Sequence, residues 1–171
     1  CIGFDKTLYA LSNNHVFANE NAAVIGSPLS QPGPLDIGCA KPPADIIGSL
    51  SDFEVLSYVD TTNKVNLMDA AIGKTTADKV DYQTWTPGYG TPSRYPLEAI
   101  YPGLLVQKCG RTTGYTKGKI TSLNASVIVG YDVGAARFQG CINIESQLRT
   151  PPFSAAGDSG SLVVTQSDRR P

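Results

Sequence analysis

A glycine-rich turn around Ser159 carries the clearest chemical signal in the sequence, which reads Gly157-Asp158-Ser159-Gly160 at this point. A serine between small residues at a tight turn presents an exposed hydroxyl, and its neighbours leave room for backbone N–H groups to converge. The amides of Gly157 and Ser159 would then stabilise an oxyanion while the Ser159 hydroxyl acts as a nucleophile. An ordinary β-turn uses the same residue types, so the turn needs chemical partners elsewhere in the chain.

A serine nucleophile requires a base that removes its proton, and that base is usually histidine. The only histidine of the 171 residues is His15, which directly follows an expected strand over residues 7–12. A lone histidine is more often a surface residue or a hydrogen-bonded core residue than a catalyst. Its place at the end of a strand, where side chains project from a rigid element, favours a functional role here.

A catalytic histidine in turn needs a buried carboxylate that fixes its tautomer and orientation. Asp69 lies between Leu67-Met68 and Ala70-Ala71-Ile72, the most apolar surroundings of any acid in the chain. Burying a carboxylate is costly unless it is paired, so Asp69 is expected to pair with His15. The alternatives are Asp52 or Asp60 as the orienting acid, in more polar surroundings, or a turn at a strand end for Asp69.

The elements that must position these residues are short runs of β-branched and aromatic residues, each bounded by Gly, Pro, Asn or Asp. Strands are expected over residues 7–12, 22–25, 53–59, 64–68, 104–109, 118–123, 126–131, 137–144 and 161–165. No apolar stripe of helical period extends over a dozen residues, so long helices are not expected. Many short strands predict an all-β fold, either a sandwich or barrels.

One stretch, residues 84–103, lacks a strand pattern and contains four prolines and three glycines. This composition predicts an ordered but irregular connector between two β-rich halves. We therefore expect an N-terminal half over 1–74 with base and acid, a connector over 75–102, and a C-terminal half over 103–171 with the nucleophile.

Charge and hydropathy exclude several classes of partner. The chain has 14 Lys and Arg against 15 Asp and Glu, a net charge of −1. This balance gives no electrostatic reason to expect nucleic acid or an anionic membrane as partner. No run approaches the roughly 18 consecutive apolar residues of a membrane span, so no membrane partner is expected on that ground either.

The four cysteines, Cys1, Cys39, Cys109 and Cys141, leave the redox compartment open. No C-x-x-C is present and a single histidine leaves few further ligands, so no metal ion is expected. The even number of cysteines fits two disulfides, in any of three connectivities, and fits four free thiols equally well.

The order His15, Asp69, Ser159, with separations of 54 and 90 residues, resembles that of the chymotrypsin-fold (trypsin-like) serine proteases. The short motifs of this family are matched by residues 10–15 before the base, 69–72 at the acid and 157–160 at the nucleophile. The stretch 108–114, Lys-Cys-Gly-Arg-Thr-Thr-Gly, resembles the turn that opens the second barrel of the family. Ser161 stands where the animal enzymes usually carry glycine. The residues of the histidine motif and of the serine motif resemble those of bacterial members more closely.

This resemblance implies two Greek-key β-barrels with the active site in the cleft between them, and a serine endopeptidase that acts on polypeptides without a cofactor. Ser159 would be the nucleophile, His15 the general base and Asp69 its orienting acid, with the amides of Gly157 and Ser159 as the oxyanion hole. By the spacing of the family, Phe153 and Ser154 would lie near the floor of the specificity pocket. No acid is present there, which disfavours a preference for basic residues.

The sequence departs from the family pattern at both ends. Only 14 residues precede His15 and 12 follow Ser159, so both barrels are expected to be incomplete in this chain and completed by missing or partner segments. Cys1-Ile2-Gly3 resembles an activated protease N-terminus but lies too close to His15, so Asp158 is expected to stabilise its own turn. Two other hypotheses are a catalytically silent protease-like module that binds proteins, and a plain β-sandwich in which His15, Asp69 and Ser159 never meet.

Overall fold

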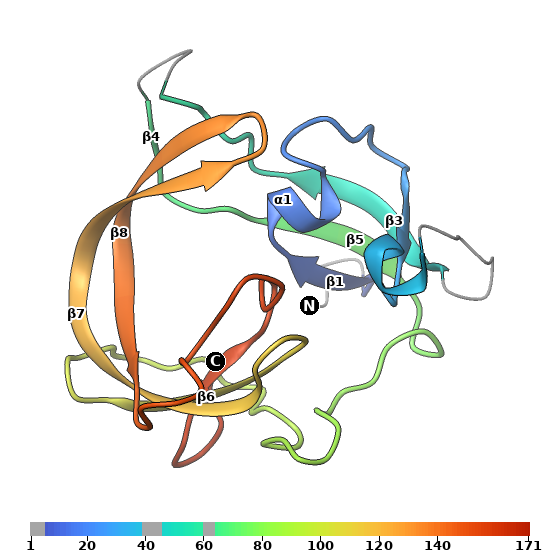
Figure 1. The fold of residues 1–171 in the computed structure, drawn as a ribbon. Helices are drawn as coiled ribbons and strands as arrows, with labels where there is room; N and C mark the ends of the chain where they lie inside the picture. The colour runs from blue at the N-terminus through green and yellow to red at the C-terminus, as the bar shows by residue number, and fades with distance from the viewer. Residues whose placement is uncertain (1–5, 39–45, 60–63) are drawn as a thin grey trace. The chain divides into compact units, whose positions relative to one another are not determined.

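A computed structural model describes residues 6–38, 46–59 and 64–171 (Figure 1). Strands dominate the secondary structure of these ranges. The helices among them are the one-turn helix α1 (Asn14–Phe17) and the 3-10 helix η1 (Pro34–Ile37). The prediction of an all-β fold without long helices is confirmed, and none of the helices described could span a membrane.

The first sheet contains four antiparallel strands in the order β1-β5-β3-β2. These strands are β1 (Leu8–Ser12), β5 (Ala71–Thr75), β3 (Ile46–Phe53) and β2 (Pro28–Ser30). Its buried core comprises Ala18, Leu29, Leu50 and Ala71. A Cβ on Gly73 would collide with the end of the Leu29 side chain, so the glycine leaves room for Leu29 in this core.

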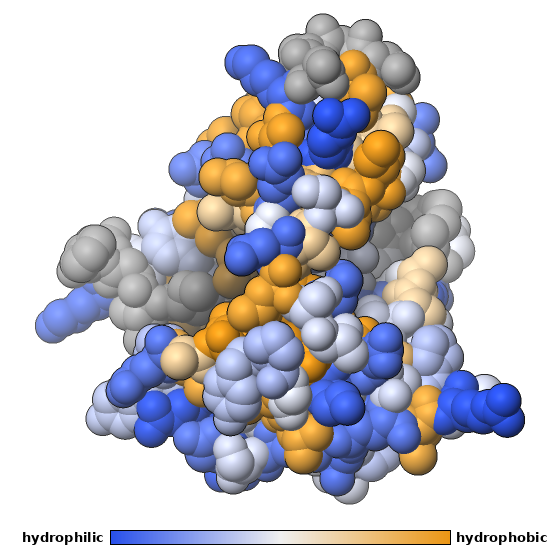
Figure 2. All heavy atoms as spheres, turned by 90° about the vertical axis from the view of Figure 1, so that its left-hand side faces the viewer, coloured by the Kyte–Doolittle hydropathy of each residue, from blue (hydrophilic) through white to orange (hydrophobic). Residues whose placement is uncertain are grey.

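The second sheet contains five strands in the order β4-β8-β7-β6-β9. They are β4 (Val65–Asn66), β8 (Gly134–Ser146), β7 (Gly114–Tyr131), β6 (Leu105–Gly110) and β9 (Val163–Thr165). The long strands β7 and β8 curl into part of a barrel (Figure 1). Figure 2 shows apolar side chains gathered along the face that carries these two strands, whose exposed apolar residues include Ile128, Val129 and Ile142.

The chain folds into two compact units that are interleaved in sequence. The first comprises Cys1–Leu56, Met68–Asp81 and Tyr131–Gly134, and the second comprises Ser57–Leu67, Tyr82–Gly130 and Ala135–Pro171. The tip of the β7–β8 hairpin thus belongs to the first unit. The linear division into 1–74, 75–102 and 103–171 stays a prediction.

Several expected strands are present with altered bounds. The strands expected over 7–12 and 104–109 are β1 and β6, and those over 137–144 and 161–165 fall on β8 and β9. The two strands expected over 118–123 and 126–131 form one strand, β7. Asn124, between them, takes a left-handed conformation (φ 58°), but the strand continues through it. The Pro- and Gly-rich stretch 84–103 contains neither helix nor strand, as predicted.

The strand expected over 22–25 is wrong. This segment forms turns, in which the Ala22 N–H donates to the carbonyl of Asn19 and the Ala23 N–H to that of Ala18. Strands β3 and β5 were not expected, because Gly48 and Gly73 interrupt the β-branched pattern that predicts a strand. Strand β2 was not expected either, because it has only three residues and begins at a proline. Gly48 allows β5 to pass close to β3, because a Cβ on Gly48 would collide with the carbonyl of Lys74.

The strand expected over 53–59 is wrong over residues 54–57, where asparagine side chains take the place of a neighbouring strand, whereas Tyr58 forms an isolated antiparallel bridge with Ala136 of β8. The side-chain amide of Asn21 donates to the carbonyl of Leu56 and accepts from its N–H, both at 2.9 Å. Asn66 binds the backbone of Ser57 in the same two-sided manner, with both bonds at 2.8 Å. The expected strand over 64–68 is reduced to the two residues of β4.

Candidate active site

His15 and Asp69 meet because β1 and β5 are antiparallel. Ser12, the last residue of β1, pairs with Ala71, the first residue of β5. The segment that follows β1 and the segment that precedes β5 therefore lie side by side at the same end of the two strands. His15 Nδ1 lies 2.5 Å from Asp69 Oδ2, and the His15 backbone N–H donates to Asp69 Oδ1 at 3.3 Å. The side-chain amide of Asn13 donates to the Asp69 carbonyl at 2.9 Å and fixes the backbone there.

The carboxylate of Asp69 is sheltered, with a side chain 10% exposed, and Tyr131 donates its hydroxyl to Oδ2 at 3.0 Å. Burial would raise the pKa of Asp69, but the hydrogen bond and charge of His15 and the bond from Tyr131 together lower it. An ionised carboxylate only accepts hydrogen bonds, so neutral His15 must carry its proton on Nδ1. Its Nε2 therefore keeps a lone pair for a proton, which is the tautomer that a general base needs.

Of the alternative acids, Asp52 accepts a hydrogen bond from the N–H of its neighbour Phe53 at 2.8 Å. Asp60 lies outside the described residues. Among the acids that the structure describes, Asp69 is the one that forms an ion pair with His15.

Ser159 lies in the second unit, on a loop of two successive turns. The Asp158 N–H donates to the carbonyl of Ala155 and the Ser161 N–H to that of Asp158, both at 3.0 Å. Gly157 (φ 94°) and Gly160 (φ 86°) take left-handed conformations that this course requires. The Ser159 side chain is exposed, and within its unit no described residue hydrogen-bonds to its hydroxyl or to the amides of Gly157 and Ser159.

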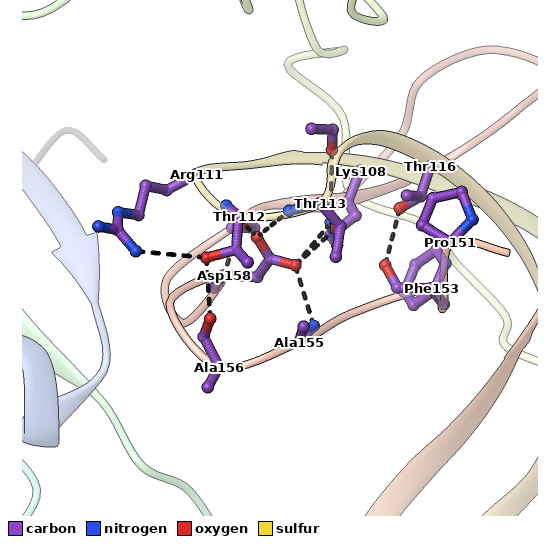
Figure 3. Close-up of polar contacts among 12 residues, drawn as sticks. Lys108, Arg111, Thr112, Thr113, Thr116, Pro151, Phe153, Ala155, Ala156 and Asp158 are labelled. Carbon is purple, nitrogen blue, oxygen red and sulfur yellow. Dashed lines mark hydrogen bonds and ion pairs between the residues drawn. The ribbon is translucent and has the colours of Figure 1, made fainter.

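A buried carboxylate, that of Asp158, holds this loop to the turn after β6 (Figure 3). It accepts from the N–H groups of Thr112 (2.8 Å), Thr113 (3.1 Å) and Ala155 (3.0 Å), and from the Thr113 hydroxyl (2.6 Å). Lys108 Nζ lies 3.2 Å from Oδ2, and neither side chain of this pair is more than 2% exposed. Burial would raise the pKa of Asp158, but the hydrogen bonds from Thr113 and its neighbours place it far below the usual range.

Asp158 therefore does more than stabilise its own turn, because it pairs with the buried counter-charge of Lys108, a residue for which no role was predicted. The two-residue period of the strand could have predicted this pairing. Lys108 stands two residues after Val106 in β6, so both side chains lie on the same face of the strand. A lysine placed on a core face needs an acidic partner.

The residues expected near the specificity pocket differ in exposure. Phe153 is buried with Val106 and Ile120, and its carbonyl accepts from the hydroxyl of Thr116 at 2.7 Å. Ser154 is exposed. The role of both residues in specificity stays a prediction.

The cysteines that the structure describes, Cys109 and Cys141, carry free thiols. Cys1 and Cys39 lie outside the described residues. No group of three or more His, Cys, Asp or Glu side chains in the described ranges could hold a metal ion.

Comparison with known proteins gives a match at the level of structure. No protein-family model and no curated protein sequence matches the chain. A Nocardiopsis protease (NAPase) superposes with a TM-score of 0.55 at 17% identity, over 98% of this chain and 70% of that one. A chymotrypsin from Cellulomonas bogoriensis (TM-score 0.51, 21% identity) and protease A from Thermobifida fusca (0.52, 19%) each match 92% of this chain.

The chain spans 65% of the length of the Cellulomonas bogoriensis structure and 64% of the Thermobifida fusca structure. At these sequence identities the likeness establishes the fold. The chain therefore has the fold of the bacterial chymotrypsin-type serine proteases.

Proposed function

We propose that the protein is a serine endopeptidase that cleaves polypeptides through Ser159, His15 and Asp69. The observation that carries this proposal is the 2.5 Å contact between His15 Nδ1 and Asp69 Oδ2. A carboxylate at this distance orients the imidazole and stabilises the imidazolium that forms when it takes a proton. The fold, shared with solved proteases, supports the same function.

In the proposed mechanism the Ser159 oxygen attacks the scissile carbonyl carbon while His15 Nε2 accepts the hydroxyl proton. The tetrahedral intermediate collapses as His15 returns that proton to the leaving amine, which leaves an acyl group on Ser159. Water then attacks the acyl group by the same route, and the serine is regenerated. Asp69 stays ionised throughout, in agreement with its lowered pKa.

The amides of Gly157 and Ser159 are the proposed oxyanion donors. Neither amide has a described hydrogen-bond partner, so both are available to a developing negative charge. The buried pair of Asp158 and Lys108 holds the backbone between them, which supplies the fixed geometry that such donors need. Loss of one oxyanion donor typically costs about 10²- to 10³-fold in kcat.

Further segments are proposed to complete the second barrel, as expected from the sequence. Strand β9 pairs only with β6 among the described strands and so leaves one edge open. Beside it lies an apolar groove of about 370 Å³, lined in part by Leu97, Ile142 and Val163. An open strand edge beside apolar surface favours cover by additional chain. The preference of the proposed pocket, with Phe153 and Ser154, depends on those segments as well.

An activity-based phosphonate probe tests the proposed function on the full chain. We expect covalent labelling that disappears in Ser159→Ala and persists in Ser126→Ala, a matched loss of an exposed hydroxyl on β7. Labelling that survives Ser159→Ala would defeat the assignment. A wild-type chain that takes no label and cleaves no peptide library would instead favour a silent module that binds proteins.

A further inference from the structure

The carboxylate of Asp69 receives a hydroxyl that its pairing with His15 does not require. Tyr131 OH donates to Oδ2, the oxygen that also faces His15 Nδ1, at 3.0 Å. The rings of Tyr131 and His15 contact at a centroid distance of 5.5 Å and an interplanar angle of 58°. Tyr131 thus touches both members of the acid–base pair, and all three residues belong to the first unit.

Tyr131 is the last residue of β7 and stands at the tip of the β7–β8 hairpin, which turns through Asp132 and Val133. The carboxylate of Glu20 holds this tip from outside the hairpin. Its Oε1 accepts from the N–H of Asp132 and its Oε2 from the N–H of Val133, each at 3.0 Å. Two hydrogen bonds to one ionised acceptor are stronger than neutral ones and fix the orientation of the turn.

Glu20 is itself held in an unusual backbone conformation. Asn19, Glu20 and Asn21 take φ values of 47°, 55° and 76°, a left-handed run of three residues that is uncommon outside glycine. The surrounding structure enforces it through Asn14, whose side chain is fully buried. Asn14 Nδ2 donates to Asn21 Oδ1 at 2.8 Å, and its Oδ1 accepts from the Asn21 N–H at 3.1 Å.

These contacts form a closed path around the acid–base pair. Asn14 precedes His15 in α1, anchors the turn that carries Glu20, and so fixes the carboxylate that binds the hairpin tip. The hairpin tip carries Tyr131 back to Asp69. Strained backbone that the surrounding structure enforces is found often at functional sites.

We infer that Tyr131 is a positioning residue for the Asp69–His15 pair, and that Glu20 keeps Tyr131 in place by docking the hairpin tip. The hydroxyl of Tyr131 prevents rotation of the Asp69 carboxylate away from His15 Nδ1. Tyr131 takes no part in proton transfer to substrate. Its effect on catalysis rests on the proposed function, whereas its effect on the imidazole does not.

The kinetic test is Tyr131→Phe in the full chain, with a peptide substrate. We expect kcat to fall about tenfold with KM unchanged, the effect of losing one hydrogen bond to a charged group. Tyr95→Phe, which removes an exposed hydroxyl from the second unit, should leave both constants unchanged. A Tyr131→Phe variant that raises only KM, or that keeps wild-type kcat, would overturn the inference.

Glu20→Ala tests the route through the hairpin tip. We expect a loss of kcat no larger than that of Tyr131→Phe, and no further loss when the two substitutions are combined, because both remove the same restraint. Losses that multiply in the double variant would overturn the role assigned to Glu20.

A spectroscopic test separates this inference from the proposed function. Because His15 is the only histidine, its imidazole signals in an NMR spectrum are assigned without ambiguity. We expect the Nδ1 proton signal of the wild type to broaden in Tyr131→Phe through faster exchange with water, at an unchanged thermal midpoint, and to persist in Tyr95→Phe. An unaltered signal in Tyr131→Phe overturns the inference even in an active protease. If the wild type proves inactive, the proposed function fails and the NMR comparison still decides.

Discussion

Two sheltered carboxylates, one in each unit, show how the partner of an acid decides its use. Asp69 shares one oxygen between His15 and Tyr131, and its side chain keeps 10% exposure. The side chain of Asp158 has no exposure, and its carboxylate accepts four hydrogen bonds and pairs with the ammonium of Lys108. The pKa of each lies below the ordinary range. Histidine is the side chain that exchanges protons near neutral pH, whereas lysine keeps its charge there. The first acid is therefore suited to chemistry and the second to fixing a loop.

The largest expected effect that tests this contrast is on rate. Asp69→Asn keeps the shape of the side chain but presents an amide to His15, which favours the wrong tautomer. We expect kcat to fall about 10⁴-fold, with stability close to that of the wild type. Peptide hydrolysis and urea unfolding measure the two quantities. Asp52→Asn is the matched control and should retain activity; an equal loss in that variant would contradict the assignment of Asp69.

The next effect is on stability in the second unit. Lys108→Met leaves the Asp158 carboxylate buried without its counter-charge, and we expect a loss of about 3–5 kcal/mol in the free energy of unfolding. Lys119→Met removes an exposed lysine from β7 and should change stability little. Urea denaturation measures both. A Lys108→Met variant as stable as the wild type would show that the hydrogen bonds alone hold Asp158.

The smallest effect concerns acid. Asp158 has a depressed folded-state pKa, so its stabilisation is complete above the unfolded pKa of about 3.9 and is lost as the pH falls toward the folded pKa. Between pH 7 and pH 3 this loss amounts to about 1 kcal/mol. Urea unfolding at both pH values measures it, and the same loss should be missing from Asp158→Asn. Equal acid sensitivity in the two proteins would assign the loss to other carboxylates.

Features fixed by a few adjacent residues were predictable from the sequence. The left-handed Gly157 and Gly160 follow from the chemistry of the turn, and the irregular course of 84–103 follows from its prolines. The apolar surroundings of Asp69 predicted a paired acid, and the structure places this acid on His15. In each case the sequence pattern that allowed the prediction lies within a few residues of the feature.

Features that depend on distant residues were not predictable in this way. Tyr131 lies 62 positions from Asp69, and nothing in its own neighbourhood marks it as a donor to a carboxylate. Strands β3 and β5 contain glycines that weaken the local strand pattern. Their place is explained by distant residues, because a Cβ on Gly48 would collide with the carbonyl of Lys74 and a Cβ on Gly73 with the side chain of Leu29. Residues 54–57 look like a strand but bind the side chains of Asn14, Asn21 and Asn66 instead.

The pairing of Asn66 with Ser57 has a consequence for how the chain can vary. Its two hydrogen bonds close a loop at the neck, so the neck does not depend on how much polypeptide the loop contains. The entropy of closing a ring grows slowly with its length, about 0.6 kcal/mol for each doubling. The two bonds of Asn66 therefore fix the approach of these two stretches of chain, whatever the length of the ring that they close.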